Sequence, residues 1–174
     1  VLNRGPSFDT APVAAVLDAE ELEVLGLLNH LAGRSLLRQV AEGRWTLHPL
    51  VRAFVAERLA PEHAAWGRMA AQYVQVAGVA DELYLRGGEE LLRGLSLFSL
   101  EWPHIEAGQA WAAAHAEEDD EAAMLCSGYP GAAVYCLTLR LHPREWVVWL
   151  EAAARAARRL GDRGSESNHL GNLG

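Results

Sequence analysis

The sequence predicts a mainly α-helical chain with one small β-hairpin near its N-terminus. Apolar residues recur at three- and four-residue spacing over most of the 174 residues, which is typical of amphipathic helices. One stretch, residues 36–47, instead combines β-branched and aromatic residues around a glycine-containing turn, which is typical of a hairpin. A chain of this length buries roughly 70% of its unfolded surface, so we expect a core that needs no disulfide or metal.

Two helices are expected before the hairpin. The first should lie around Pro12–Leu17. The second should run over Glu20–Ala32, where Leu22, Leu25, Leu28, Asn29 and Ala32 follow helical spacing. Gly33 then supplies a stop signal, because glycine readily adopts the backbone conformation that ends a helix.

The hairpin is expected to join Leu36–Val40 to Arg44–Leu47 and to lead directly into a third helix. His48 stands at the corner, and Pro49 suits the first helical position because the backbone N–H that it lacks is not needed there. One helical stripe follows, made of Leu50, Val51, Phe54, Val55 and Leu59. The order helix, helix, hairpin, helix is that of a winged helix, so we assign residues 1–60 to a winged-helix domain.

The rest of the chain is expected to be helical throughout. Glycine, proline and charged clusters separate the helices, which we expect at Pro61–Arg86, Glu89–Leu100, from Trp102, at Asp120–Cys126, Ala132–Leu141 and from Pro143 to Leu160. Antiparallel helices joined by short turns are the material of α-solenoids. We therefore assign residues 61–160 to a helical linker domain of antiparallel helices.

The C-terminal residues 161–174 are predicted to begin a tetratricopeptide repeat (TPR). The first helix of such a repeat places a bulky residue three positions before a Leu-Gly pair, and Leu170 precedes Leu173-Gly174 in this way. We expect the chain to be part of a longer protein, because it begins with Val1 and stops before the second helix of the repeat.

Three stretches together resemble a known family. The corner TLHPLVRAFVAERL at 46–59 resembles the histidine corner in the winged-helix domain of STAND ATPases, the NB-ARC-type signalling switches. WPHIEAGQAWAA at 102–113 and the stretch 139–162 are similar to the helices that precede the repeats in bacterial members. The resemblance is strongest at 45–59 and 139–174 and diffuse over 61–100.

The resemblance implies a nucleotide-sensing role for His48. In this family the corner histidine contacts the β-phosphate of ADP and holds the closed, inactive form. Leu47 and Pro49 flank it here, where the family's plant-type signature has Met and Asp. Leu47 keeps the apolar anchor, and Pro49 removes a carboxylate. The implied partners are the parent's own nucleotide-binding domain, which would hold ADP or ATP with magnesium, and a protein or peptide trigger bound by the TPR array.

Charge argues against nucleic acid as a partner. The formal net charge is −8, whereas binding to phosphates needs a basic surface. In a DNA-reading winged helix the helix before the hairpin enters the major groove. Its first turn here carries Glu20, Glu21 and Glu23, and the hairpin offers only Arg38 and Arg44 as cations.

Motifs of enzymes are missing from the sequence. It contains no HExxH zinc motif, no Gly-x-Ser-x-Gly elbow and no Gly-rich loop ending in Gly-Lys-Ser/Thr. We therefore expect no catalysis and no cofactor held by this segment alone. The absence of a signal peptide and of an apolar run that could span a bilayer predicts a cytoplasmic location, where Cys126 and Cys136 would be reduced, buried thiols.

Three further features need interpretation, and two of them allow more than one. The acidic run 117–121 is an acidic docking site or calcium loop, or a solvated turn that complements the next helix dipole. The second Leu-His-Pro, around His142, marks a helix start, and we expect a structural histidine there. The six tryptophans are core residues, or a subset of them lines a peptide groove.

Two other functions remain open at the level of sequence. The chain is alternatively a helical-repeat adaptor that binds a protein or peptide, with the N-terminal module as a cap. The third alternative is a transcription regulator whose winged helix binds DNA.

Overall fold

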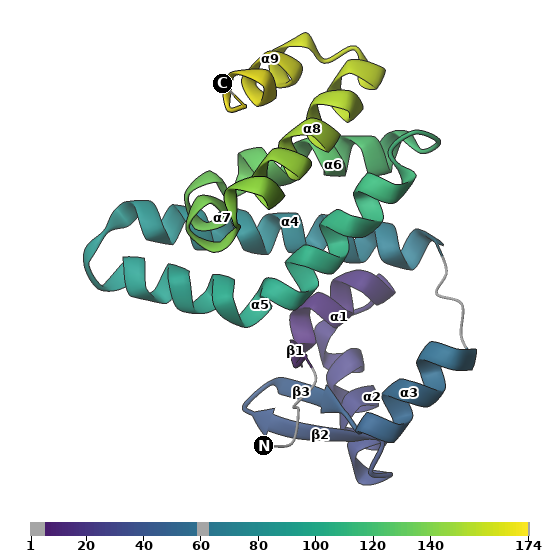
Figure 1. Cartoon of the computed structure of the whole chain (residues 1–174). Helices are drawn as coiled ribbons and strands as arrows, with labels where there is room; N and C mark the ends of the chain where they lie inside the picture. The colour runs from purple at the N-terminus through teal and green to yellow at the C-terminus, as the bar shows by residue number, and fades with distance from the viewer. Residues whose placement is uncertain (1–5, 59–62, 174) are drawn as a thin grey trace. The chain divides into compact units, whose positions relative to one another are not determined.

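The computed structural model describes residues 6–58 and 63–173 (Figure 1). Over these residues the chain has nine helices and one three-stranded antiparallel sheet, so the predicted mainly α fold is confirmed. The chain divides into two compact units, Val1–Met69 and Ala70–Gly174, and each is described by itself.

The first unit contains the sheet and the shorter helices. Its elements are β1 (Phe8–Asp9), α1 (Thr10–Leu17), α2 (Glu21–Gly33), β2 (Leu37–Ala41), β3 (Arg44–Leu47), α3 (Pro49–Arg58) and the first residues of α4 (His63–Arg86). The predicted helices around Pro12–Leu17 and Glu20–Ala32, the hairpin and the helix after His48 are confirmed, with small shifts at their ends.

Strand β1 is an element that the sequence did not reveal. It pairs antiparallel with β3, with Phe8 opposite Trp45 and Asp9 opposite Arg44, so that the strand order is β1-β3-β2. The Arg44 guanidinium is buried; it forms an ion pair with Asp9 (3.0 Å) and donates to Ser7 Oγ (2.8 Å). A strand of two residues has no pattern of its own and exists because β3 offers it a partner.

The core of the first unit is built around Trp45, which is 1% exposed. The indole Nε1 donates to Thr10 Oγ1 (3.1 Å), and the same hydroxyl donates to the Gly43 carbonyl in the hairpin turn (3.2 Å). The buried apolar members of this core are Ala14, Val24, Leu28, Leu37 and Trp45. They come from α1, α2 and both hairpin strands, so the hairpin and the helix pair share one core.

The end of α2 differs from the prediction. Gly33 is the last helical residue, and Ser35 takes the left-handed conformation with φ of 60°. The Ser35 N–H donates to the Ala32 carbonyl (2.9 Å), and the Leu36 N–H donates to the Leu31 carbonyl (3.1 Å). These two bonds form a Schellman motif. The helix therefore ends at Gly33, and the left-handed residue of its stop is Ser35, two positions after the glycine that was expected to supply it.

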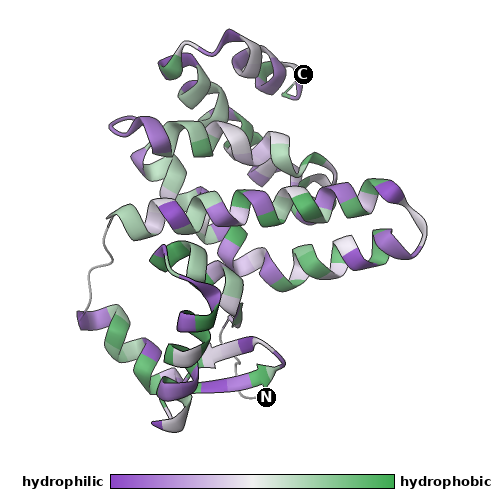
Figure 2. Cartoon of the chain, turned by 180° about the vertical axis from the view of Figure 1, so that it is seen from behind, coloured by the Kyte–Doolittle hydropathy of each residue, from purple (hydrophilic) through white to green (hydrophobic). Residues whose placement is uncertain are grey.

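Some apolar side chains of the first unit are exposed. In α2 the buried face carries Val24 and Leu28, whereas Leu22, expected on the apolar stripe, is 80% exposed. In α3 no described residue is buried: Leu50 is 74% and Phe54 58% exposed, and Figure 2 shows hydrophobic positions along this helix. Leu59, the last member of the predicted stripe, lies outside the described residues.

The second unit is made of helices. After α4 come α5 (Gly88–His115), α6 (Asp120–Ala132), α7 (Val134–Arg140), α8 (Pro143–Leu160) and α9 (Arg163–Gly171). Helices α4 and α5 run antiparallel on either side of a turn in which Gly87 and Gly88 both have positive φ, and α8 packs against α6 and α9 (Figure 1). The expected start at Pro61-Glu62 and the final residue of the repeat pattern, Gly174, lie outside the described residues.

The two helices expected at Glu89–Leu100 and from Trp102 are one helix. Helix α5 continues through Pro103, although proline lacks the N–H that an interior position uses. Phe98, Trp102 and Ile105, on both sides of the proline, are buried in the core. Packing on both sides of Pro103 therefore outweighs the lost hydrogen bond.

Helix α6 also continues through a proline. The break expected at Tyr129-Pro130-Gly131 lies later, at Ala133, whose φ and ψ are −142° and 46°. Tyr129 and Pro130 are buried inside the unit, so the helix continues until its apolar face is covered. Helix α7 then begins at Val134, and the predicted helix over Ala132–Leu141 is confirmed in its central part.

Two glycines allow the helices of the second unit to approach closely. A Cβ at Gly94 of α5 would overlap the Ala80 carbonyl oxygen of α4. A Cβ at Gly108 would overlap the Tyr129 hydroxyl and lie 3.1 Å from Ala70 Cα. The Tyr129 hydroxyl donates to the Ala70 carbonyl (2.9 Å), and its ring meets Trp149 of α8 edge to face, with centroids 6.1 Å apart. Tyr129 of α6 thus contacts α4, α5 and α8.

No single helix over residues 6–58 and 63–173 is long and apolar enough to cross a membrane. Helices α6 and α7 pass the same length and hydropathy test only as a pair, and they are bent by 80° at their junction.

The contact of Gly108 with Tyr129 predicts a coupled effect on stability. Gly108→Ala should lower the free energy of unfolding by about 1–3 kcal/mol, as overpacking does, and Tyr129→Phe by about 1 kcal/mol through the lost hydrogen bond. The double variant should lose less than the sum, because removing the hydroxyl makes room for the new methyl group. Urea unfolding of the four proteins measures the coupling.

Gly128→Ala is the matched control for this cycle. A Cβ there meets nothing within 4 Å, so this variant should be unchanged or more stable by up to about 1 kcal/mol through helix propensity. Strict additivity of Gly108→Ala and Tyr129→Phe would contradict the described contact.

Candidate functional site

His48 lies at the corner between β3 and α3, and backbone hydrogen bonds hold it there. Its N–H donates to the Leu36 carbonyl (3.1 Å), and its own carbonyl accepts from the Arg52 N–H in the first turn of α3 (3.0 Å). The side chain is exposed. The main chain is therefore held from the strand side and the helix side while the imidazole faces outward from the first unit.

The imidazole itself caps the helix. The Leu50 N–H donates to His48 Nδ1 over 3.3 Å. With Nδ1 as an acceptor, the neutral ring carries its proton on Nε2. This proton can be donated to an anion, and the positive end of the α3 dipole lies beside it and favours a negative charge. The corner is thus chemically able to give one hydrogen bond to a phosphate oxygen.

His142 shows which part of this geometry is common to helix starts. Its Nδ1 accepts from the Arg144 N–H (3.2 Å), and its own N–H donates to the Glu145 carboxylate (2.9 Å), which completes a capping box. The predicted structural role of His142 is confirmed. His48 repeats the ring contact, but Val51 stands where a capping box would have its carboxylate. His48 therefore caps a helix that follows a strand, but it lacks the carboxylate partner that His142 has in Glu145.

The acidic run 117–121 forms a helix start. Asp119 Oδ1 accepts from the N–H groups of Glu121 (2.7 Å) and Ala122 (3.2 Å) at the beginning of α6. This geometry favours the interpretation as a turn that caps the next helix. In the part of the chain that the structure describes, no three His, Cys, Asp or Glu side chains are grouped as metal ligands would be.

Cys126 and Cys136 are free and buried, as predicted. Burial raises the pKa of the Cys126 thiol to about 11. Burial, and then the nearby Asp81 carboxylate, raise the pKa of Cys136 to about 12. A nucleophilic cysteine needs the opposite shift, because the thiolate is the reactive form. Neither thiol is therefore suited to nucleophilic chemistry at neutral pH.

Three of the six tryptophans are core residues. Trp45, Trp102 and Trp149 are buried, and the rings of Trp102 and Trp149 stack with centroids 6.0 Å apart. The other three, Trp66, Trp111 and Trp146, are half-buried. The core interpretation is confirmed for the buried three.

The hairpin offers DNA less charge than the sequence suggested. Of its two arginines, Arg44 is buried and paired with Asp9, so only Arg38 is exposed. Glu20, Glu21 and Glu23 are all exposed at the start of α2. Phosphates approaching this helix would meet three carboxylates.

A buried Ser127–His169 pair was not predicted. Ser127 Oγ lies 3.1 Å from His169 Nε2, between α6 and α9, and His169 is 4% exposed. Asp162 is near His169 in sequence, but its carboxylate caps α9 by accepting from the Ser165 N–H (3.0 Å) and hydroxyl (2.6 Å). The burial of serine and histidine leaves no access for a substrate. The pair connects α9 to α6. Its two residues lie 42 positions apart in the chain, and no sequence motif links them.

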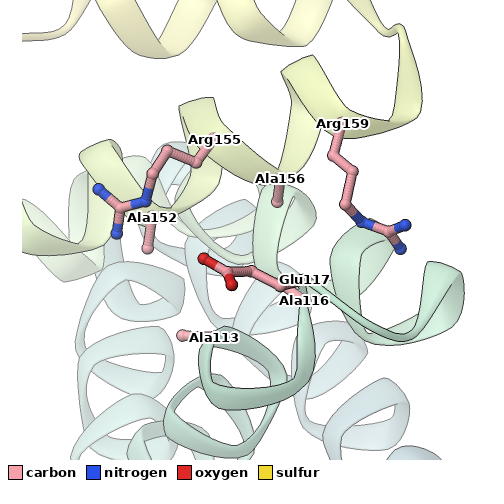
Figure 3. A pocket seen from close by; sticks show the side chains of 7 residues that line it. All are labelled: Ala113, Ala116, Glu117, Ala152, Arg155, Ala156 and Arg159. Carbon is pink, nitrogen blue, oxygen red and sulfur yellow. The ribbon is translucent and has the colours of Figure 1, made fainter.

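A hollow of about 250 Å³ lies between the end of α5 and α8 (Figure 3). It is lined by Ala113, Ala116, Glu117, Ala152, Arg155, Ala156 and Arg159. The sequence analysis did not predict this hollow.

Comparisons with known proteins add no relative. No protein-family model, no curated protein and no solved structure matches this chain.

The burial of His169 predicts a pH-dependent stability. Desolvation lowers its pKa from 6.5, with partial opposition from Ser127 and the Asp162 charge. Below pH 6.5 the unfolded chain binds this proton more readily than the folded chain does. The contribution of His169 is therefore fully present above pH 6.5 and is lost as pH falls towards the folded-state pKa.

Urea unfolding at about pH 7.5 and about pH 5.5 of the natural chain and of His169→Gln measures this contribution. The natural chain should lose more stability on acidification than His169→Gln, because the amide can bond to Ser127 and does not titrate. Equal losses in both proteins would contradict the assignment.

Proposed function

We propose that this chain is a regulatory, non-catalytic part of a STAND/NB-ARC-type signal-transduction ATPase. The first unit acts as a lid that responds to the bound nucleotide, and the helical unit couples this lid to a TPR sensor array. The observation that carries the proposal is His48, held by backbone bonds at the β3–α3 corner with its ring exposed.

The order of elements supports the lid. Helices α1 and α2, the β2–β3 hairpin and α3 follow one another as in a winged helix, and α1, α2 and the hairpin share one core. The end of the chain supports the link to repeats. Gly161 ends α8 in the left-handed conformation, and α9 then packs against α8, as the first helix of a repeat would against the helix before it.

The His48 corner can supply a single hydrogen bond to a nucleotide. Nε2–H of His48 suits a phosphate oxygen, whereas the sequence has no phosphate-binding loop to hold the rest of ADP or ATP or its magnesium. The parent's nucleotide-binding domain would supply these groups. With ADP bound, His48 would hold the lid closed. Binding of the trigger by the repeats would favour the open state, so that two ligands bias one equilibrium.

The proposal predicts the effect of two substitutions on the parent protein. His48→Ala should release ADP at least about tenfold faster, because a charge-assisted hydrogen bond is lost. His48→Asn should do the same while leaving α3 capped, since asparagine is a good N-cap residue. The amount of co-purified ADP and its rate of exchange are the measurements.

His142→Ala is the matched control, because it removes the same ring-to-backbone cap at another Leu-His-Pro corner. It should leave ADP exchange unchanged. If both His48 variants retain ADP like the natural protein, His48 is a helix cap only and the lid proposal fails.

A helical-repeat adaptor is the second candidate function. Leu50 and Phe54 on α3 are exposed apolar side chains, which favours binding of another protein surface at this helix. An adaptor predicts that removing residues 1–60 from the parent leaves partner binding intact and nucleotide exchange unchanged. The lid proposal predicts that the same deletion accelerates ADP release.

DNA binding is the third alternative, and the acidic start of α2 predicts a negative result. At about 10 µM protein and low salt, where non-specific electrostatic binding is strongest, the chain should not retard a DNA duplex in a gel-shift assay. If the chain retards the duplex and Arg38→Ala abolishes this effect, the expectation is wrong and the DNA-binding transcription regulator is favoured.

A further inference from the structure

Four of the seven residues that line the hollow between the end of α5 and α8 are alanines. Ala113 from the last turn of α5 and Ala116 just after that helix, with Ala152 and Ala156 from α8, contribute only methyl groups to it. The space of about 250 Å³ is a little below the range of pockets that enclose drug-sized ligands, roughly 300–1,000 Å³. It suits a small molecule with a modest apolar part.

Two opposite charges at this hollow have no ionic partner in the described part of the chain. Arg159 is engaged, because its Nη2 lies 2.6 Å from Asp120 Oδ1. Among the described residues, Arg155 and Glu117 form no ion pair with each other or with another side chain. Figure 3 shows the Glu117 carboxylate between the Arg155 and Arg159 side chains. The hollow therefore presents one available cation and one available anion.

The helix end strengthens this division of charge. Glu117 follows the C-terminus of α5 (His115), where the helix dipole is negative and favours a positive group. Arg155 stands on α8 across the hollow, and its guanidinium is suited to a carboxylate. A simple anion would be repelled by Glu117, and a simple cation by Arg155.

We propose that this hollow binds a small zwitterion, namely a free α-amino acid with a short apolar side chain. The carboxylate would pair with Arg155, the ammonium group with Glu117 and the end of α5, and the side chain would lie on the four alanines. The site does not depend on the role of His48. Since both charged groups are exposed, the expected affinity is weak, with a dissociation constant on the order of 1 mM.

The test compares three probes that share the same branched apolar group on the full chain. L-valine carries both charges, isovalerate lacks the ammonium group and isobutylamine lacks the carboxylate. Amide NMR signals of the four lining alanines should shift and saturate with L-valine. Each single-charge probe should bind at least about tenfold more weakly, because one charge-assisted bond is lost.

Variants decide whether the charges act as assigned. Arg155→Gln and Glu117→Gln should each weaken L-valine binding about tenfold, while Arg144→Gln, an exposed arginine in the first turn of the same helix, should not. Unchanged signals of residues outside the hollow show that a variant is folded. The proposal is overturned if L-valine causes no saturable shift up to about 50 mM, or if either single-charge probe binds as well as L-valine.

Discussion

The helical unit depends on the close crossing of α4, α5 and α6 at Tyr129. The phenol fills the space left by the missing Cβ of Gly108, its hydroxyl donates to the Ala70 carbonyl, and its ring contacts Trp149. A buried hydroxyl without a partner would be unfavourable, so this one hydrogen bond sets where α6 can lie against α4. The tryptophan stack then places α8, and α8 in turn carries α9 and one wall of the hollow.

A second buried polar contact controls the bend between α6 and α7. Asp81 of α4 is buried, and its carboxylate accepts from the Cys136 N–H in the first turn of α7 (2.7 Å). A helix start has N–H groups without intrahelical partners, and the negative charge also suits the positive end of the helix dipole. A side chain of α4 thus caps the N-terminus of α7. Together with Tyr129 and the Ser127–His169 pair, this contact joins α4, α6, α7 and α9 through buried polar groups.

The two Leu-His-Pro corners show how context changes the meaning of one tripeptide. Both histidines accept an N–H through Nδ1, because the ring of a residue before Pro at the first helical position reaches the N–H two residues on. His142 is completed by Glu145 and is part of a self-contained cap. Both histidines are exposed, but His48 follows a paired strand and lacks that carboxylate. The difference is what makes His48 a candidate for contact with something outside the chain, and it supports the proposed lid.

Features that depend on neighbours along the chain could be predicted from the sequence. The helix starts at Pro49 and Pro143, the hairpin turn at Gly43 and the α4–α5 turn at Gly87-Gly88 follow from local backbone preferences, and so does the position of His48 between strand and helix. Tertiary structure alone decided strand β1, the continuity of α5 through Pro103 and of α6 through Pro130, the Ser127–His169 pair and the hollow beside Arg155. In each of these, packing or pairing between residues far apart in the chain outweighs a local preference or acts where no local preference exists, and spacing along one sequence carries no record of such contacts.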